Sequence, residues 1–400
     1  MKILLFTFRF PYPPFRGDKL KIFNLAKNLS KNNSVTILTF HQNKTELSYL
    51  NEFQKYNINV VTVGFSFIVG MWNVFRALFS KVPLQVAFYQ SGAMRERLQN
   101  LFKEENFDVV YFHLVRSLGY KDTLPQNSTL RIVDFTDSIS LYISRIISVT
   151  KNPFKKLLLN FEFRRICKFE EYARDFHALF ICSDIDKAQL LESHPGLNLK
   201  ILPNGIDGEY FFPQDVEVEE KRIIFTGNIP YFANSDAIVY FAEEIFPLVL
   251  EKEPDAKFYI VGQYPTRKVK NLASSSIIVK GFVQDIRLEY MKSTVNIAPV
   301  RFGAGTLNKV LEPLALGVPV VCSSIAIAGM PSELKKYIFV ADSKQEFADK
   351  ILEIFNNPEI RNNLAREGSD KVRSSLNWNN VTAKFEQDIH ELHNKLLNNN

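Results

Sequence analysis

The chain has 400 residues, of which 46% are hydrophobic and 23% charged, and its formal net charge is +6. This length suggests two domains, and the mild charge permits anionic nucleotides or lipid surfaces as partners, with no nucleic-acid partner expected. No run of about 18 uncharged apolar residues occurs, so no transmembrane helix is expected. The apolar start is interrupted at Arg9 and Pro11 and predicts a buried strand rather than a signal peptide. Three scattered cysteines, Cys167, Cys182 and Cys322, indicate reduced thiols and a cytoplasmic location, not a disulfide frame or a zinc site.

The beginning of the chain predicts a strand, loop, helix and strand. Lys2 to Phe8 forms the first strand, and a helix with apolar residues at helical spacing runs from about Leu20 to Lys31. Between them, a proline-rich loop closes with Gly17-Asp18-Lys19. The dinucleotide fingerprint Gly-x-Gly-x-x-Gly is absent, so this opening does not predict a dinucleotide site.

Two further predicted strands end in polar residues that are candidates for function. The strand 107–113 ends at His113, and the strand 130–135 is followed by Asp137. Ligands of open α/β sheets bind at the carboxyl ends of strands, and imidazole acts as a base or donor near neutral pH. The alternatives are a partly buried His113 bonded to backbone, and an Asp137 that caps the next helix. Asp184-Ile185-Asp186 matches an Asp-x-Asp metal motif, but its place at a helix start favours capping.

A basic stretch lies between residues 145 and 174. Its eight cations are interleaved with leucine and phenylalanine, and it holds three acids, Glu162, Glu170 and Glu171. The cations are Arg145, Lys151, Lys155, Lys156, Arg164, Arg165, Lys168 and Arg174. A basic amphipathic helix with aromatic residues can lie on an anionic membrane, which would suit a lipid-linked acceptor. The alternative is a solvated helix that covers the sheet.

The segment Ile201–Asp207 predicts a hinge, with a domain boundary near Asn204 and a polar linker after it. The second domain then opens with a strand at 222–226 that ends in Gly227-Asn228. The next strand, 256–261, ends in Gly262, and a third occupies 277–281. These alternating elements again predict a parallel α/β sheet.

The stretch from Ala298 to Ser323 carries the strongest functional signal. A strand ends at Pro299, a glycine-rich loop follows, and a helix from Thr306 to Leu316 leads into another buried strand. The free N–H groups and dipole at such a helix start favour an anion. Lys309 lies one turn before Glu312, so both project from nearly the same face. A cation beside the loop suits phosphate and a carboxylate one turn deeper suits sugar hydroxyls, as a nucleoside diphosphate with its ribose presents them.

This stretch, the Asn204-Gly205-Ile206-Asp207 turn and the N-terminal Pro-Pro-x-x-Gly-Asp-Lys loop together resemble a family 4 glycosyltransferase. The chain most resembles the sugar transferases of bacterial exopolysaccharide clusters. It implies an α/β protein of the GT-B fold, in which two Rossmann-like domains face each other across a cleft. Residues 1–203 would bind the acceptor, with a C-terminal helix at about 380–397 packed back on them, and residues 204–379 would bind the nucleotide-sugar.

The resemblance also implies site residues. Catalytic candidates are His113, Lys309 and Arg301. The expected acceptor contacts are Lys19 and Asp137, and no metal ligand or cofactor is expected. The expected donor contacts are Gly17, Asn228, Gly262, Val283, Gly303, Gly305, Thr306, Lys309 and Glu312.

The chain departs from the family at two points. No Arg or Lys occurs between Gly227 and Asp236, where many members hold the diphosphate. Arg301 and Lys309, or backbone N–H groups, would then supply that contact. In addition, Ala304 stands where members often place the first of two glutamates, so contacts to the transferred sugar must come from elsewhere.

The sequence therefore predicts a retaining, metal-independent glycosyltransferase that moves a sugar from a nucleoside-diphosphate sugar to a glycan or lipid-linked acceptor. Such an enzyme would be cytoplasmic, with peripheral contact to the inner membrane as a further expectation. Two alternatives are a GT-B-fold nucleotide-sugar epimerase and a non-catalytic scaffold subunit that binds sugar nucleotides. The Pro-Pro-x-x-Gly-Asp-Lys loop and the spacing of Lys309 and Glu312 argue against the epimerase. For a scaffold subunit, the presence of Lys309 and Glu312 still indicates nucleotide binding.

Overall fold

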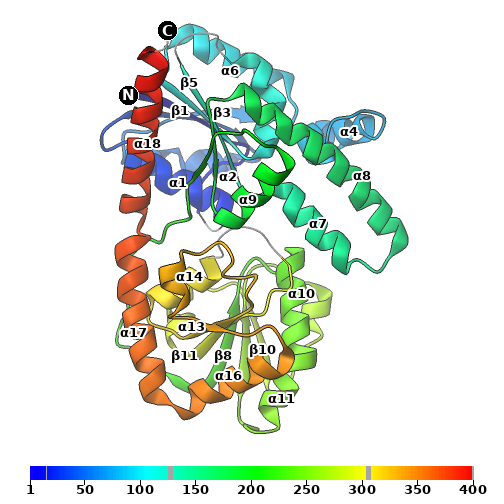
Figure 1. Cartoon of the computed structure of the whole chain (residues 1–400), viewed down its shortest axis with the longest axis vertical. Helices are drawn as coiled ribbons and strands as arrows, with labels where there is room; N and C mark the ends of the chain where they lie inside the picture. The colour runs from blue at the N-terminus through cyan, green and yellow to red at the C-terminus, as the bar shows by residue number, and fades with distance from the viewer. Residues whose placement is uncertain (15, 125–128, 303–307, 399–400) are drawn as a thin grey trace. The chain divides into compact units, whose positions relative to one another are not determined.

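The computed structural model describes residues 1–14, 16–124, 129–302 and 308–398. The chain divides into two compact units. The first comprises Met1–Pro203 together with Trp378–Asn400, and the second comprises Asn204–Asn377. Figure 1 shows each unit as a sheet covered by helices.

The first unit is built on a sheet of seven parallel strands in the order β3-β2-β1-β4-β5-β6-β7. The strands are β1 (Lys2–Phe6), β2 (Ser34–His41), β3 (Asn59–Gly64), β4 (Val109–His113), β5 (Leu130–Thr136), β6 (Ala178–Ile181) and β7 (Leu199–Ile201). The α-helices are α1 (Gly17–Leu29), α2 (Lys44–Ser48), α3 (Leu50–Gln54), α4 (Phe67–Ala77), α5 (Leu84–Phe88), α6 (Gly92–Glu104), α7 (Ile139–Val149), α8 (Pro153–Glu170), α9 (Asp184–Ser193) and α18 (Trp378–Asn398). Two 3₁₀ segments, η1 (Val115–Thr123) and η2 (Glu171–Asp175), complete the unit.

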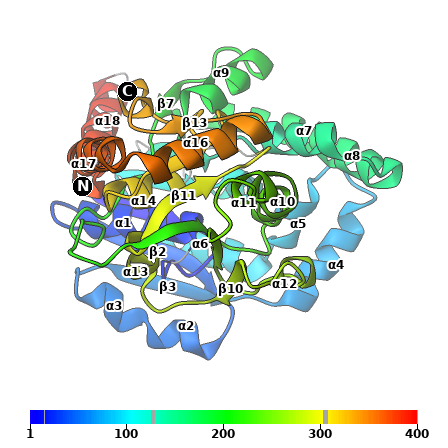
Figure 2. The same ribbon diagram turned by 90° about the horizontal axis from the view of Figure 1, so that it is seen from below.

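The second unit has a sheet of six parallel strands in the order β10-β9-β8-β11-β12-β13. The strands are β8 (Glu219–Thr226), β9 (Lys257–Val261), β10 (Ile277–Gly281), β11 (Ser293–Ala298), β12 (Val320–Cys322) and β13 (Phe339–Val340). The helices are α10 (Phe232–Tyr240), η3 (Phe241–Ile245), α11 (Phe246–Leu250), α12 (Arg267–Lys270), α13 (Ile286–Met291), α14 (Asn308–Ala315), α15 (Ser332–Lys335), α16 (Lys344–Asn356) and α17 (Pro358–Ser375). Figure 2 shows helices on both faces of this sheet.

In both units the strand order reverses in the middle of the sheet. The first strand of each unit, β1 or β8, lies beside the fourth, β4 or β11, because the chain returns to the centre before it builds outward again. Parallel strands bring all their carboxyl ends to one edge, and a crevice forms there where the order reverses. This doubly wound topology therefore designates one ligand-binding edge in each unit.

Successive side chains of the central strands point to opposite faces of the sheet, and apolar residues occupy both sets of positions. Each sheet is therefore buried on both faces. In β8, Ile223 and Phe225 join the core cluster with α10, α11 and α16, whereas Ile224 faces the cluster that contains Tyr290 of α13. In β1, residues of one parity pack with α1 and α18, and those of the other pack with α6. The long C-terminal helix α18 thus belongs to the first unit, although α17 belongs to the second.

The boundaries of α1 differ from the predicted ones by less than one turn. Helix α1 begins at Gly17 rather than near Leu20, with the extended residue Arg16 as its N-cap. The described part of the helix in the second unit runs from Asn308 to Ala315. Helix ends are decided by local capping geometry, which hydrophobic periodicity does not report.

Candidate active site

Helix α14 brings Lys309 and Glu312 to the ligand-binding edge of the second unit. The helix follows β11, the strand beside which the order reverses, and the segment 303–307 before it lies outside the described residues. The predicted contacts Gly303, Gly305 and Thr306 fall in that segment, as does Ala304. Both side chains are half-buried on the same face of the helix.

The ammonium group of Lys309 lies at the end of β8. It donates a hydrogen bond to Oδ1 of Asn234 and sits 4.5 Å from the centroid of the Phe225 ring. Asn234 in turn donates from Nδ2 to the carbonyl of Asn228, at 2.8 Å. Burial lowers the pKa of Lys309 to about 7. A bound phosphate would favour the charged form, so this lysine is suited to respond to an anion.

Gly227 makes room for that lysine. A Cβ added at Gly227 would lie 3.3 Å from Nζ of Lys309 and 2.8 Å from Nδ2 of Asn234, and the backbone there has φ of +152°. Gly262 is confined more severely, because an added Cβ would lie 1.9 Å from the carbonyl oxygen of Gly227. The two glycines therefore let the ends of β8 and β9 approach each other beneath the site.

The carboxylate of Glu312 is held by a tyrosine of the neighbouring helix. Tyr290 of α13 donates from its hydroxyl to Oε2 of Glu312 at 3.2 Å, and the same hydroxyl is hydrogen-bonded to Thr226 at the end of β8. Burial raises the pKa of Glu312 to about 7, whereas Tyr290 and Lys309 act to lower it. Sequence reasoning missed Tyr290, Thr226 and Asn234, because no motif distinguishes them from ordinary core or helix residues.

Arg301 has an ionic partner of its own. It forms a two-point ion pair with Asp236 of α10, at 2.9 Å and 2.6 Å, and lies over the ring of Tyr240. Hydrogen bonding to Asp236 raises the pKa of Arg301. Its charge is thus balanced in this structure, so Lys309 is the better-placed cation for a phosphate, and a role for Arg301 stays a prediction.

Two of the remaining donor candidates lie around the same edge, and a third lies in the first unit. Asn228 is exposed after β8, and Val283 is half-buried after β10, against the cluster that contains Tyr290. Gly17 begins α1 in the first unit, with open space around its Cα. The structure brings Asn228, Lys309 and Glu312 together, and contact of each with a ligand stays a prediction.

In the first unit, His113 is fully buried at the end of β4. Its Nδ1 lies 3.0 Å from the hydroxyl of Thr7, and its Nε2 lies 3.3 Å from that of Thr136. Burial lowers the pKa of His113 to about 4, so the ring is neutral near pH 7. Its partners are side chains rather than the backbone expected as the alternative. A direct part in catalysis would require the ring to be uncovered, and stays a prediction.

A buried network lies beside this histidine. Lys21 and Asp134 are both fully buried and form an ion pair of 2.7 Å, and Tyr111 also donates to Asp134. The backbone N–H of Thr136 donates to the same carboxylate at 2.6 Å. These hydrogen bonds compensate the buried charges and hold the ends of β4 and β5 in place.

The two acceptor candidates have different surroundings. Lys19 pairs with Glu46 at 3.4 Å, so its charge is already balanced. Asp137 is half-buried and accepts a hydrogen bond from the thiol of Cys182 at 3.1 Å, and burial raises its pKa to about 7. The expectation that Asp137 caps the next helix was wrong, because the hydroxyl of Ser138 caps α7.

The segment Asp184–Asp186 begins α9, as the capping interpretation requires. The cap is nevertheless the preceding residue, since the hydroxyl of Ser183 accepts from the N–H of Asp186. Asp186 is buried and accepts from the N–H of Ser138. Over the described ranges, no group of three His, Cys, Asp or Glu side chains is arranged to hold a metal ion.

Three arginines gather at the ligand-binding edge of the first unit around one carboxylate. Arg9 follows β1 and pairs with Asp18 at 2.5 Å, and Arg16 pairs with the same carboxylate at 3.6 Å. Burial alone would raise the pKa of Asp18, but the nearby arginines lower it to about 2. Arg116 follows β4 and lies 4.8 Å from the ring centroid of Tyr89, with its Nε buried and without a hydrogen-bond partner. Sequence reasoning missed this cluster, because Arg116 is distant in the chain from the other members.

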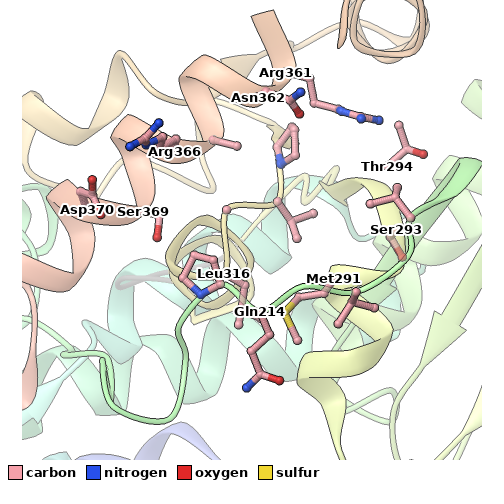
Figure 3. A pocket seen from close by; sticks show the side chains of 17 residues that line it. Gln214, Met291, Ser293, Thr294, Leu316, Arg361, Asn362, Arg366, Ser369 and Asp370 are labelled. Carbon is pink, nitrogen blue, oxygen red and sulfur yellow. The ribbon is translucent and has the colours of Figure 1, made fainter. Parts of the chain in front are cut away.

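A separate hollow of about 280 Å³ lies at the other end of the second unit's sheet. It is lined by Ser293 at the start of β11, by Leu316 after α14 and by Asn362, Arg366 and Asp370 of α17 (Figure 3). Because Ser293 begins the strand whose carboxyl end leads toward Lys309, this hollow is distinct from the candidate site.

Comparison with known proteins agrees with this architecture. Residues 220–357 match the family model for glycosyl transferases group 1, and this range contains α14 with both of its polar residues. A Klebsiella pneumoniae relative, described as an uncharacterized 44.6 kDa protein in the cps region, is 23% identical over 375 residues, which cover 89% of this chain and 91% of the relative.

Two solved structures illustrate the fold. Sucrose-phosphate synthase from Thermosynechococcus elongatus has a TM-score of 0.71 at 12% identity, and the match covers 98% of this chain and 99% of that one. Anabaena HepE, solved in complex with UDP and glucose, has a TM-score of 0.69 at 12% identity, with the same coverage. These neighbours show the fold, and the family match shows the class of enzyme. The chain is therefore a glycosyltransferase of the GT-B fold, with a group 1 glycosyltransferase domain in its second unit.

Proposed function

We propose that the enzyme is a retaining, metal-independent glycosyltransferase that moves a sugar from a nucleoside-diphosphate sugar to a glycan or lipid-linked acceptor. The observation that carries the proposal is the half-buried pair Lys309 and Glu312 where the strand order of the second unit reverses. The lysine would bind the diphosphate, and the glutamate would accept hydrogen bonds from the ribose hydroxyls.

Cell-surface polysaccharide biosynthesis is the proposed setting, supported by the position of the Klebsiella relative in a cps region. HepE was solved with UDP and glucose, which supports a nucleotide-sugar as donor. A lipid-linked acceptor would place the enzyme at the cytoplasmic face of a membrane. The proposed transfer reaction requires no resident cofactor.

In the proposed mechanism the nucleoside diphosphate leaves while the acceptor hydroxyl attacks the same face of the sugar and passes its proton to the departing phosphate oxygen. Lys309 would stabilise the charge that develops on the departing phosphates, in a half-buried site where its field is weakly screened. Glu312, held by Tyr290, would fix the ribose and so orient the bond that breaks. The lysine would supply the positive charge that a metal ion provides in other transferases, which is the reason for proposing metal independence.

Thermal shift against UDP, GDP, ADP, TDP and CMP, with and without magnesium, tests the donor site. A nucleotide present at about 100 times its Kd should add roughly 2.7 kcal/mol to the free energy of unfolding. Stabilisation by one nucleotide without magnesium is the expected result and selects the sugar donors for turnover assays. Conversion of the donor without an acceptor would instead indicate the epimerase, and binding without any turnover would indicate the scaffold subunit. Retention is then checked from the anomeric configuration of the product.

Nucleotide binding should be linked to proton uptake at pH 8. Free Lys309 has a pKa of about 7 and is mostly neutral at pH 8, whereas a bound phosphate favours the charged form and raises that pKa. At any pH between the pKa of Lys309 in the free enzyme and its pKa in the complex, the complex therefore holds more protons than the free enzyme. Titration calorimetry in buffers of different ionisation enthalpy measures this uptake. The uptake should disappear in Lys309→Arg, whose charge is permanent, and its persistence there would contradict the assignment.

The arginine cluster of the first unit supports an acceptor that carries phosphate. Arg9, Arg16 and Arg116 outnumber the one carboxylate between them, and Arg116 has no ion pair among the described residues. We expect Arg116→Gln to raise the KM for the acceptor about tenfold, the loss of roughly one charge-assisted hydrogen bond, with nucleotide binding unchanged. The matched control is Arg97→Gln on α6. A parallel loss of nucleotide affinity would assign Arg116 to the donor instead.

A further inference from the structure

Helix α4 exposes its large apolar side chains and buries its small ones. Within the helix only Gly70 and Ala77 are buried. Gly70 packs so closely on Phe88 that an added Cβ would lie 2.9 Å from both the ring and the carbonyl oxygen of that residue. A surface helix ordinarily turns its large apolar face to the core, and this one has the reverse arrangement. Its sequence is apolar, but which face it buries was decided by the contact with α5.

The apolar residues of α4 and the two that follow it form a large exposed surface. Ile68 and Phe79 are each 82% exposed, and Trp72 is 59% exposed. The exposed members are Phe67, Ile68, Val69, Met71, Trp72, Phe75, Leu78 and Phe79. Contiguous apolar surface of this kind marks a site of interaction rather than ordinary surface variation.

Helix α8 adds a second apolar stripe. Phe154, Leu157, Leu158 and Phe161 recur at helical spacing and are all exposed, with Phe154 at 77%. The residues of this helix that are buried lie in its C-terminal half. The sequence left two interpretations of α8, a solvated helix that covers the sheet and a helix that lies on a membrane. Among the described residues, the apolar side chains of its N-terminal half are exposed and do not cover the sheet, which favours the membrane interpretation for that half.

The C-terminal half of α8 fastens it to the segment between α4 and α5. Arg165 is buried and donates to the carbonyls of Leu78, Ser80 and Val82. Glu162 accepts from the N–H of Leu84 at 3.0 Å. The two apolar stripes are therefore joined through hydrogen bonds between their elements. The helices that carry them, α4 and α8, both project from the first unit in Figure 1. We call the exposed apolar residues of segments 67–79 and 154–161 the apolar face.

The charges around the apolar face are almost all positive. Exposed cations within or beside the two segments are Arg76, Lys81, Lys151, Lys155, Lys156, Arg164 and Lys168. The segment 66–82 contains no acidic residue, and the one acid of segment 149–168 is Glu162, which is engaged by backbone N–H groups. A second copy of the chain would bring the same positive charge to this surface and be repelled. Anionic headgroups over an apolar interior match both features.

We propose that the apolar face docks on an anionic lipid bilayer, with its aromatic and aliphatic side chains at the level of the acyl chains and its cations at the headgroups. Across the described parts of the chain, every helix is too short or too polar to span a bilayer. The inference goes beyond the proposed transfer reaction, because it concerns a surface of the first unit that makes no use of the donor residues.

The chain contains a natural probe for this docking. It has two tryptophans, of which Trp72 is exposed on α4 and Trp378 is buried. In full-length protein carrying Trp378→Phe, fluorescence reports Trp72 alone. Vesicles of phosphatidylcholine with about one-third phosphatidylglycerol should shift its emission to shorter wavelength, and brominated acyl chains should quench it. Emission that is unchanged at saturating vesicle concentration would overturn the proposal.

Sedimentation with the same vesicles separates the contribution of the apolar residues to vesicle binding from that of the cations. Ile68→Ser/Trp72→Ser/Phe75→Ser should weaken vesicle binding at least tenfold, while Leu288→Ser/Ile360→Ser/Leu397→Ser, which removes exposed apolar residues elsewhere, should not. Lys81→Gln/Lys155→Gln/Lys156→Gln should weaken binding to anionic vesicles and remove its salt dependence. Nucleotide binding, unchanged in all three variants, verifies folding independently of the membrane. If the first variant binds vesicles as well as the parent protein, the apolar face serves another partner. The same follows if light scattering shows a dimeric parent and a monomeric first variant.

Discussion

Replacing Lys309 with alanine should lower the turnover of the nucleotide-sugar about 100- to 1,000-fold, the usual effect of losing one group that stabilises a departing anion. The reason is that neither of the other predicted sources of positive charge for the diphosphate is available. Arg301 is engaged by Asp236, and the loop from Gly227 to Asp236 contains no basic residue. Steady-state kinetics with a fixed acceptor measure the effect, and kcat should fall more than KM rises if the contact strengthens in the transition state.

The control for this prediction is Lys371→Ala, which removes an exposed lysine from α17 of the same unit. The thermal midpoint of Lys309→Ala should remain close to that of the parent enzyme, because a half-buried lysine with a lowered pKa is not a source of stability. Turnover retained within threefold would exclude Lys309 as the group that stabilises the leaving phosphates.

Glu312→Ala should weaken nucleotide binding about ten- to hundredfold while the fold stays intact. The carboxylate lies beside Lys309 and is held by Tyr290, so its free oxygen is oriented to accept from a ribose hydroxyl. A hydrogen bond to a charged group contributes about 1.5–3 kcal/mol, which corresponds to this loss of affinity. Titration calorimetry with the nucleotide selected by thermal shift measures it.

Two variants sharpen the interpretation of that result. Tyr290→Phe keeps the carboxylate but removes the hydroxyl that holds it, so a smaller loss of affinity is expected. Glu243→Gln, an exposed glutamate of the same unit, should leave affinity unchanged. If Glu312→Ala binds the nucleotide as tightly as the parent enzyme, the ribose assignment is wrong.

The positions of Lys309 and Glu312 followed from sequence alone, because their spacing on one helix face is a local property. The α/β class was predicted from alternating strands and helices, which determine a parallel sheet, and the GT-B fold was predicted from the resemblance of the motifs to a known family. Both predictions were confirmed. The ligand-binding edges could be anticipated for the same reason: in such sheets the carboxyl ends of parallel strands meet on one side.

Tertiary structure alone decided which side chains surround those positions. Asn234 and Tyr290 reach Lys309 and Glu312 from separate helices, and Arg9 meets Arg116 only because β1 pairs with β4. It also decided burial: Arg301 acquired a partner, and His113 lost contact with solvent. The apolar residues of α4 show the same limit most plainly, because the sequence determines that they are apolar, whereas the packing of Gly70 against Phe88 determines that they face outward. Local periodicity specifies an element and its faces, but only the neighbours of that element select which face is covered.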